Sequence, residues 1–158
     1  MRRVFSVGGR YFLSGAKAAA GDAGLWYYSD DGVTWKRVVA DATTPYGWDV
    51  FAMFERADGK LVAIAADGGS ATTDFSSSDG GVSWHSEGPS RASAFSFAEI
   101  PGLMVEYDMQ AGIGYASTDR GATWQKLDTG LGTFTPLGNA MLSISIAGTT
   151  ATVWIAKP

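Results

Sequence analysis

The chain has 158 residues, of which 46% are hydrophobic and 18% charged, a composition that fits a folded domain and excludes a disordered segment. Its net charge of −4 and scattered basic residues argue against nucleic-acid binding, which usually requires a basic patch. The lack of cysteine excludes disulfides, thiolate metal sites and a cysteine nucleophile, and a single histidine, His85, cannot form a histidine-rich metal site. We therefore expect neither a metal nor a cofactor.

The N-terminal residues predict a β-hairpin and no targeting segment. Residues 4–15 form two short apolar runs on either side of Gly8-Gly9. A secretory signal needs an apolar core of roughly 7–15 residues, and here Gly8, Gly9 and Arg10 interrupt the run after four residues. No apolar run approaches the roughly 20 residues of a membrane span. We expect a soluble chain without membrane insertion and without a signal peptide.

The remainder of the chain predicts further strands and no helix. The Ala-rich segment 15–24 is too short and too rich in glycine for a stable helix. Three more hairpins are expected: 50–66 around Asp58-Gly59, 95–108 around Pro101-Gly102, and 141–156 around Gly148. Two shorter strands follow each of the first three hairpins: 24–28 and 34–39, 71–77 and 83–88, and 113–117 and 123–128.

One eight-residue phrase joins each pair of shorter strands. It reads YSDDGVTW at 28–35, SSDGGVSW at 77–84 and STDRGATW at 117–124. The three phrase tryptophans are spaced by 49 and 40 residues, and the hairpin glycines 9, 59, 102 and 148 by 50, 43 and 46. Two markers with one period indicate a repeat of the kind found in solenoids, propellers and arrays.

Four antiparallel strands at this period correspond to one blade of a β-propeller. The sequence therefore predicts an all-β, propeller-like array of about three and a half four-stranded blades within a single domain, 1–158. The expected blades are about 3–40, 46–88 and 93–129, followed by a partial blade at about 134–158 that lacks the phrase.

The phrase resembles the Asp-box, or BNR repeat, of pattern S-x-D-x-G-x-T-W, a family that includes sialidases and many non-catalytic propellers. The second and third copies match closely, and the first has Tyr28 where serine is expected. The positions that the resemblance assigns to the box are Asp30, Gly32 and Trp35; Ser77, Asp79, Gly81 and Trp84; and Ser117, Asp119, Gly121 and Trp124.

We interpret the box residues as structural. An aspartate inside a turn accepts hydrogen bonds from the backbone N–H groups of that turn, and the glycine tolerates a positive φ. The tryptophan is expected to return the chain to the core and to bury apolar area between adjacent sheets. Asp30, Asp79 and Asp119 are therefore expected to be neither catalytic nor metal-binding. The resemblance also implies that the boxes lie at the blade periphery, away from the functional face.

The opposite loops, which join the second strand to the third and one blade to the next, are the expected ligand face. Aromatic and acidic side chains on these loops would suit stacking on a sugar together with hydrogen bonds to its hydroxyl groups. The candidates are Tyr46, Trp48, Asp67, Asp108 and Phe134. For Trp48 the alternative is burial in the core, because tryptophan is highly buried on average.

The sialidase resemblance would imply a tyrosine nucleophile with a glutamate partner, an acidic aspartate and three arginines that bind the substrate carboxylate. This arginine set is not recognisable. Arg10 and Arg56 belong to hairpins on the opposite side from the expected ligand face, and Arg120 lies inside a box. We therefore predict no catalytic residues and no enzyme.

The resulting hypothesis is a non-enzymatic structural or host-surface, glycan-binding module. It resembles propeller modules of phage tails and virions, which would place it in a virion. The alternatives are a sialidase-like glycoside hydrolase fragment and a protein-docking assembly factor. Three and a half blades do not close a ring, so we expect self-association or contact with other virion or assembly proteins, with the apolar hairpin 141–156 as the joining element.

Overall fold

The computed structural model describes residues 3–15, 25–40, 49–66, 71–92, 95–127, 132–147 and 150–158. All regular structure in these residues is β-strand, as the sequence predicts, and the strands form four sheets. None of the described residues forms a helix that could cross a membrane. The chain divides into two compact units, Met1–Ser90 and Arg91–Pro158, which are described in turn.

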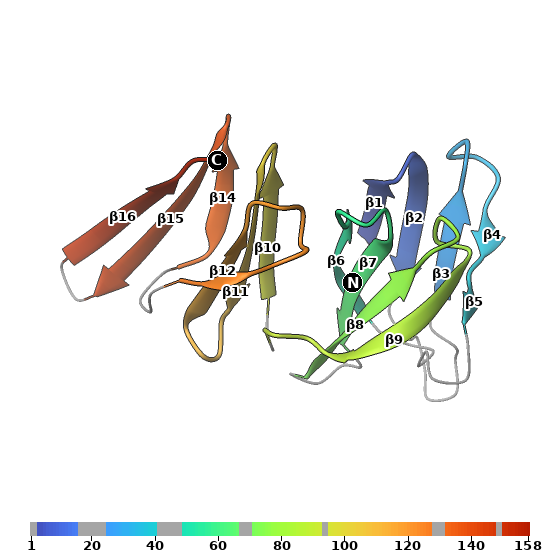
Figure 1. The fold of residues 1–158 in the computed structure, drawn as a ribbon, viewed down its shortest axis with the longest axis horizontal. Helices are drawn as coiled ribbons and strands as arrows, with labels where there is room; N and C mark the ends of the chain where they lie inside the picture. The colour runs from blue at the N-terminus through green and yellow to red at the C-terminus, as the bar shows by residue number, and fades with distance from the viewer. Residues whose placement is uncertain are drawn as a thin grey trace. The chain divides into compact units, whose positions relative to one another are not determined.

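The first unit contains two sheets (Figure 1). Sheet 1 consists of β1 (Arg3–Val7), β2 (Arg10–Gly15), β3 (Leu25–Ser29) and β4 (Lys36–Arg37). Sheet 2 consists of β6 (Asp49–Glu55), β7 (Leu61–Ala66), β8 (Thr72–Ser77) and β9 (Ser83–Pro89), with β5 (Val39–Ala40) added at its outer edge. The four successive strands of each sheet are antiparallel, which is the arrangement of a propeller blade.

The core of the first unit lies between the facing sides of sheets 1 and 2. Trp84 of β9 is fully buried, and its ring centroid lies 6.1 Å from that of Phe12 and 5.6 Å from that of Trp26. Trp26 also meets Phe75 at 5.8 Å. All three contacts are edge-to-face, the geometry that aromatic quadrupoles favour. These rings hold the two sheets together.

The outer strand of sheet 1 differs from the single strand expected at 34–39. Lys36–Arg37 pair with β3, and the N–H of Val38 donates to the carbonyl of Trp26 at 3.0 Å. Val39–Ala40 then run parallel to β9 of sheet 2. The chain changes partner because the outer edge of β9 offers unpaired backbone groups, which a passing strand satisfies. The predicted limit of the first blade at residue 40 therefore falls within a strand of sheet 2.

The second unit also contains two sheets. Sheet 3 consists of β10 (Phe95–Ile100), β11 (Leu103–Asp108), β12 (Ile113–Ser117) and β13 (Gln125–Lys126). Sheet 4 has three strands, β14 (Phe134–Leu137), β15 (Ala140–Ala147) and β16 (Thr150–Ala156). The core of this unit joins the two sheets, with Leu103 and Val105 of β11 packed in one cluster with Phe134 and Met141.

Sheet 4 contains the expected hairpin 141–156 as the antiparallel pair β15–β16. It is preceded by a further hairpin that was not expected, β14–β15, with Gly138 at a φ of 62°. Phe134, which was expected on a loop between blades, is the first residue of β14. Pro136 is compatible with β14 because β14 is an edge strand, where a missing N–H breaks no ladder.

Gly81 provides a test of the packing between sheets 1 and 2. Its φ is 87°, and a Cβ there would lie 2.3 Å from the buried ring of Phe12. Gly59 has a similar φ of 80° but no atom within 4 Å of such a Cβ. We expect Gly59→Ala to cost about 1–2 kcal/mol from backbone strain alone. Gly81→Ala should cost about 1–3 kcal/mol more, because it also overpacks the core.

Urea unfolding of both variants, followed by tryptophan fluorescence, measures the difference. Equal losses of unfolding free energy would contradict the close packing of Phe12 against this turn.

Candidate functional site

The repeated turns at 77–84 and 117–124 have one hydrogen-bonding pattern. In the first, the Ser77 hydroxyl donates to Asp79 Oδ1 at 2.7 Å and accepts from the N–H of Gly81 at 2.8 Å. Asp79 also accepts from the N–H groups of Val82 and Ser83 and from the Ser83 hydroxyl. The carboxylate is thus occupied by the donors of its own turn.

The turn at 117–124 repeats these contacts. The Ser117 hydroxyl donates to Asp119 at 2.8 Å and accepts from the N–H of Gly121 at 2.8 Å. Thr123 donates to Asp119 through both its N–H, at 2.9 Å, and its hydroxyl, at 2.5 Å. Asp119 therefore fixes the conformation of its turn.

These hydrogen bonds control the acidity of both aspartates. At Asp79, burial raises the pKa, but the bonds from Ser83, Ser77 and Val82 outweigh it and lower the pKa from 3.8 to about 2. At Asp119, the bonds from the Thr123 hydroxyl and N–H, with a further bond from Ser117, lower the pKa from 3.8 to about 2. Both carboxyl groups are ionised at neutral pH, so neither can act as a general acid there.

The first copy of the phrase uses a different aspartate from the one expected. Asp31, and not Asp30, accepts from the Ser29 hydroxyl at 2.9 Å and from the N–H groups of Val33 and Thr34 at 2.8 and 2.7 Å. The hydrogen bond from the Thr34 N–H is the main cause of a pKa well below the usual range for Asp31.

This turn is one residue shorter than the other two. Ser29 accepts from the N–H of Gly32, three residues on, whereas Ser77 accepts from Gly81, four residues on. The sequence contains a signal for this assignment. Ser29-x-Asp31 has the same Ser-x-Asp spacing as the other two copies if the first copy is aligned to them with a deletion of one residue.

Asp30 has a different role between the two sheets of the first unit. It accepts from Arg10 Nε at 2.6 Å and lies 3.7 Å from Lys36 Nζ. Arg10 also donates through Nη1 to the carbonyl of Gly80, in the neighbouring turn of sheet 2, at 2.7 Å. Asp30 thus orients an arginine that connects two repeated turns.

The three phrase tryptophans differ in burial. Trp84 is fully buried, and its Nε1 donates to the carbonyl of Gly81 at 3.0 Å. Trp124 makes the same bond to Gly121 at 3.2 Å but is only half-buried, as is Trp35. The expectation that each tryptophan enters the core is therefore wrong for Trp35 and Trp124. The short first turn places Trp35 six residues after its serine instead of seven, which changes its position relative to the sheet.

The expected ligand face is described only in part. Tyr46, Trp48 and Asp67 lie outside the described residues. Asp108 is 6% exposed, and its Oδ1 accepts from the N–H groups of Gln110 and Ala111 at 2.9 and 2.8 Å. Its prediction as a ligand residue is corrected, because the carboxylate stabilises the turn between β11 and β12.

Phe134 is likewise corrected as a candidate for the ligand face. It is the first residue of β14, is 7% exposed, and lies 6.5 Å from Tyr107 between ring centroids. It belongs to the core between sheets 3 and 4, where a large apolar ring is stabilised by burial.

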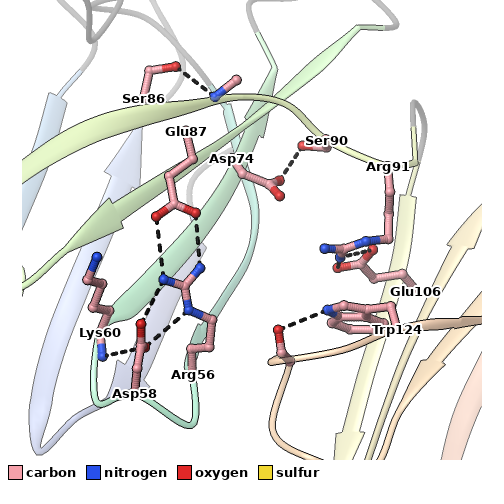
Figure 2. A network of polar contacts seen from close by, with 12 residues as sticks. Arg56, Asp58, Lys60, Asp74, Ser86, Glu87, Ser90, Arg91, Glu106 and Trp124 are labelled. Atoms are coloured by element: carbon pink, nitrogen blue, oxygen red, sulfur yellow. Dashed lines mark hydrogen bonds and ion pairs between the residues drawn. The ribbon is translucent and has the colours of Figure 1, made fainter.

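Two ion-pair groups were not predicted from the sequence (Figure 2). On sheet 2, Arg56 pairs with Asp58 at 2.9 Å and with Glu87 at 3.0 Å, so its guanidinium connects the β6–β7 turn to β9. The hydrogen bond between Arg56 and Asp58 is the main cause of both shifts in acidity. It raises the pKa of Arg56 above its usual range and lowers the pKa of Asp58 to about 2.

On sheet 3, Arg91 Nη1 donates to both carboxylate oxygens of Glu106, at 3.1 and 3.0 Å. Its guanidinium carbon lies 4.5 Å from the ring centroid of Trp124, so the arginine is sandwiched between a carboxylate and an aromatic face (Figure 2). Glu106 is fully buried. An acid within the apolar run LMVEYD is a sequence signal for such a paired carboxylate.

These charged groups connect turns and strands of the scaffold. Arg10 pairs with Asp30, Arg56 with Asp58 and Glu87, and Arg91 with Glu106. Within the described ranges no group of three or more histidine, aspartate or glutamate side chains is placed to hold a metal ion. The geometry provides rigid turns and cross-links between strands.

Comparison with known proteins finds similarity at the level of structure. No family model matches the chain, and no curated protein matches it. An exo-β-1,3-galactanase of Phanerochaete chrysosporium superposes with a TM-score of 0.51 and 11% identity, over 99% of this chain and 47% of that one. An α-L-arabinanase of Penicillium chrysogenum superposes with a TM-score of 0.54 and 14% identity, over 98% of this chain and 60% of that one. A GH74 enzyme of Niastella koreensis superposes with a TM-score of 0.52 and 17% identity, over 91% of this chain and 22% of that one.

These similarities define the fold. The neighbours are β-propeller proteins, and the four sheets of this chain form a partial β-propeller. The chain spans between 22% and 60% of the length of these three proteins. At 11–17% identity, the similarity concerns architecture and not activity.

The first repeated turn provides a test of which aspartate stabilises it. We expect Asp31→Ala to lower the melting temperature clearly, because two backbone donors and the Ser29 hydroxyl lose their acceptor. Asp30→Ala, in the adjacent position, removes only exposed ion pairs and should have a small effect. Calorimetry of the two variants decides between them, and a larger effect at Asp30 would reverse the assignment.

The lowered pKa values predict acid sensitivity. Because the folded-state pKa of Asp79 and Asp119 is about 2 against an ordinary value of 3.8, their contribution to stability is complete above about pH 4. It should be lost as the pH falls from about 4 to about 2. Urea unfolding across this range should show a steep fall in unfolding free energy, reduced in the Asp79→Asn, Asp119→Asn double variant. A double variant with an unchanged pH profile would contradict the prediction.

Proposed function

We propose that this chain is a non-catalytic Asp-box propeller module that binds a glycan through the loops joining the second strand to the third and one sheet to the next. The observation that carries the proposal is the use of the described acids. Asp31, Asp79, Asp108 and Asp119 accept hydrogen bonds within turns, and Glu106 is buried against an arginine. Glycoside hydrolysis needs two carboxyl groups facing a substrate, and these acids are engaged elsewhere.

The choice of a glycan as ligand rests on the structural neighbours. The galactanase structure contains galactose, and the arabinanase structure contains arabinobiose. Propellers place recognition on loops supported by rigid sheets, and the repeated turns provide that rigidity here. Tyr46 and Trp48 remain the sequence candidates for stacking on a sugar ring, with Asp67 as a hydrogen-bonding partner.

The setting that we infer is a virion surface, where such a module would contact host glycans. Support for this setting is analogy with Asp-box propeller modules of bacterial viruses, together with an incomplete number of blades that calls for partners. The regular Ser-Asp-Gly turns support the Asp-box assignment, since each uses its carboxylate to hold one hairpin.

The experiment is a titration of the intact chain with arabinan, β-1,3-galactan and sialylated oligosaccharides, combined with assays for reducing-end release. We expect binding to at least one of these glycans and no hydrolysis. Trp48→Ala should weaken that binding about tenfold, the loss expected when one stacked aromatic face is removed. Trp35→Ala is the matched control, because Trp35 belongs to a repeated turn, which the proposal assigns to the scaffold and not to the ligand face.

The outcomes separate the alternatives. Release of sugar above the blank would favour the glycoside hydrolase fragment. Absence of binding to all three glycans would reject the glycan-binding proposal. Equal weakening by Trp48→Ala and Trp35→Ala, with unchanged melting temperatures, would remove Trp48 from the ligand face.

A further inference from the structure

The two sides of each sheet are distinguished by a common register. Three sheets begin with a two-residue hairpin, in which Val7 pairs with Arg10, Ile100 with Leu103, and Leu137 with Ala140. We number the second strand of each hairpin from Arg10, Leu103 or Ala140 as position one. Position two is then Tyr11, Met104 or Met141. Position three is Phe12, Val105 or Leu142.

The packed examples show which sheet each position faces. Position three faces the following sheet, because Phe12 packs against Trp84 of sheet 2 and Val105 clusters with Phe134 and Met141 of sheet 4. Position two faces the preceding sheet, as Met141 is fully buried in the core shared with sheet 3. Where two successive sheets pack together, the position-three side of the first sheet therefore meets the position-two side of the next.

Sheet 4 presents an apolar position-three side. Leu142 pairs directly with Ile155, and Ile144 pairs with Val153, so these four side chains form one patch, the tail face. Ile144, Val153 and Ile155 are 49%, 56% and 64% exposed. In sheet 1 the same side is filled by Phe12 and Trp26, which are buried against sheet 2. The tail face is thus as apolar as a side that packs against another sheet, but none of the described residues covers it.

Sheet 1 presents the complementary position-two side. Val4 pairs with Leu13, and Leu13 pairs with Tyr27, so these residues form a row across three strands. With Tyr11 they make up the head face, in which Val4 is 65% and Tyr11 42% exposed. In sheet 2 the corresponding side carries Leu61 and is buried against sheet 1.

We propose that the tail face of one chain packs against the head face of a second copy of this chain, in the manner of successive sheets within the chain. We choose a second copy as the occupant because a packed contact joins one position-three side and one position-two side. The tail face is a position-three side, the head face is a position-two side, and one chain carries both. The contact is heterologous, joining two different surfaces. Two copies contribute eight sheets, which lies within the four to eight blades typical of closed propellers.

The test places a charge on either face. Val4→Glu changes the head face and Val153→Glu the tail face, and both positions are exposed enough for the single chain to fold. Val33→Glu is the matched control, since Val33 is 82% exposed in a repeated turn and belongs to neither face. Sedimentation velocity of the intact chains measures the assembly. We expect wild type and Val33→Glu to assemble, and each of the other two variants alone to sediment as a monomer.

Mixing the two variants distinguishes a heterologous contact from other associations. An equimolar mixture of Val4→Glu and Val153→Glu retains one unmodified tail–head pair, so a species of twice the monomer mass should return. A monomeric wild type would overturn the proposal. So would assembly that survives Val4→Glu alone, which would indicate pairing of sheet 4 with itself, or a mixture that stays monomeric.

Discussion

The packing of one sheet face against the next is the interaction on which the first unit depends. The buried ring of Trp84 contacts Phe12 and Trp26 from the neighbouring sheet, and Trp26 in turn contacts Phe75. The strands of each sheet are short, and a single short sheet cannot bury enough apolar area to be stable. Stability therefore comes from pairs of sheets, and in the first unit the turn at 77–84 must place Trp84 correctly for the pair to form.

The repeated turns meet this requirement with local chemistry. A serine hydroxyl and an aspartate carboxylate satisfy the backbone N–H groups of the turn, so the hairpin end needs no help from solvent or from other segments. Asp79 and Asp119 are thus occupied within their own turns, and we place recognition on the loops and not on the turns.

Charged residues away from the turns connect strands that are distant in sequence. Arg56 joins a hairpin turn to β9, and Arg91 lies between Glu106 and Trp124 (Figure 2). Glu106 is fully buried, and Arg91 provides it with a partner of opposite charge. These groups stabilise a particular alignment of strands, whereas the apolar contacts specify only that the sheet faces meet.

The sequence by itself determined the all-β class, the repeat and the turn residues, because strand alternation and turn chemistry act over a few neighbouring positions. It chose Asp30 where the short first turn uses Asp31, a local error, and it missed the burial of Phe134 and the place of the hairpin 141–156 within sheet 4, which depend on other strands of the second unit. Asp31 replaced Asp30 because a shorter turn moved the donors by one residue, and Phe134 was drawn into a core that included Tyr107. Only the tertiary structure decided the burial of Phe134 and the place of the hairpin within sheet 4, since burial and strand pairing are properties of the assembled sheets.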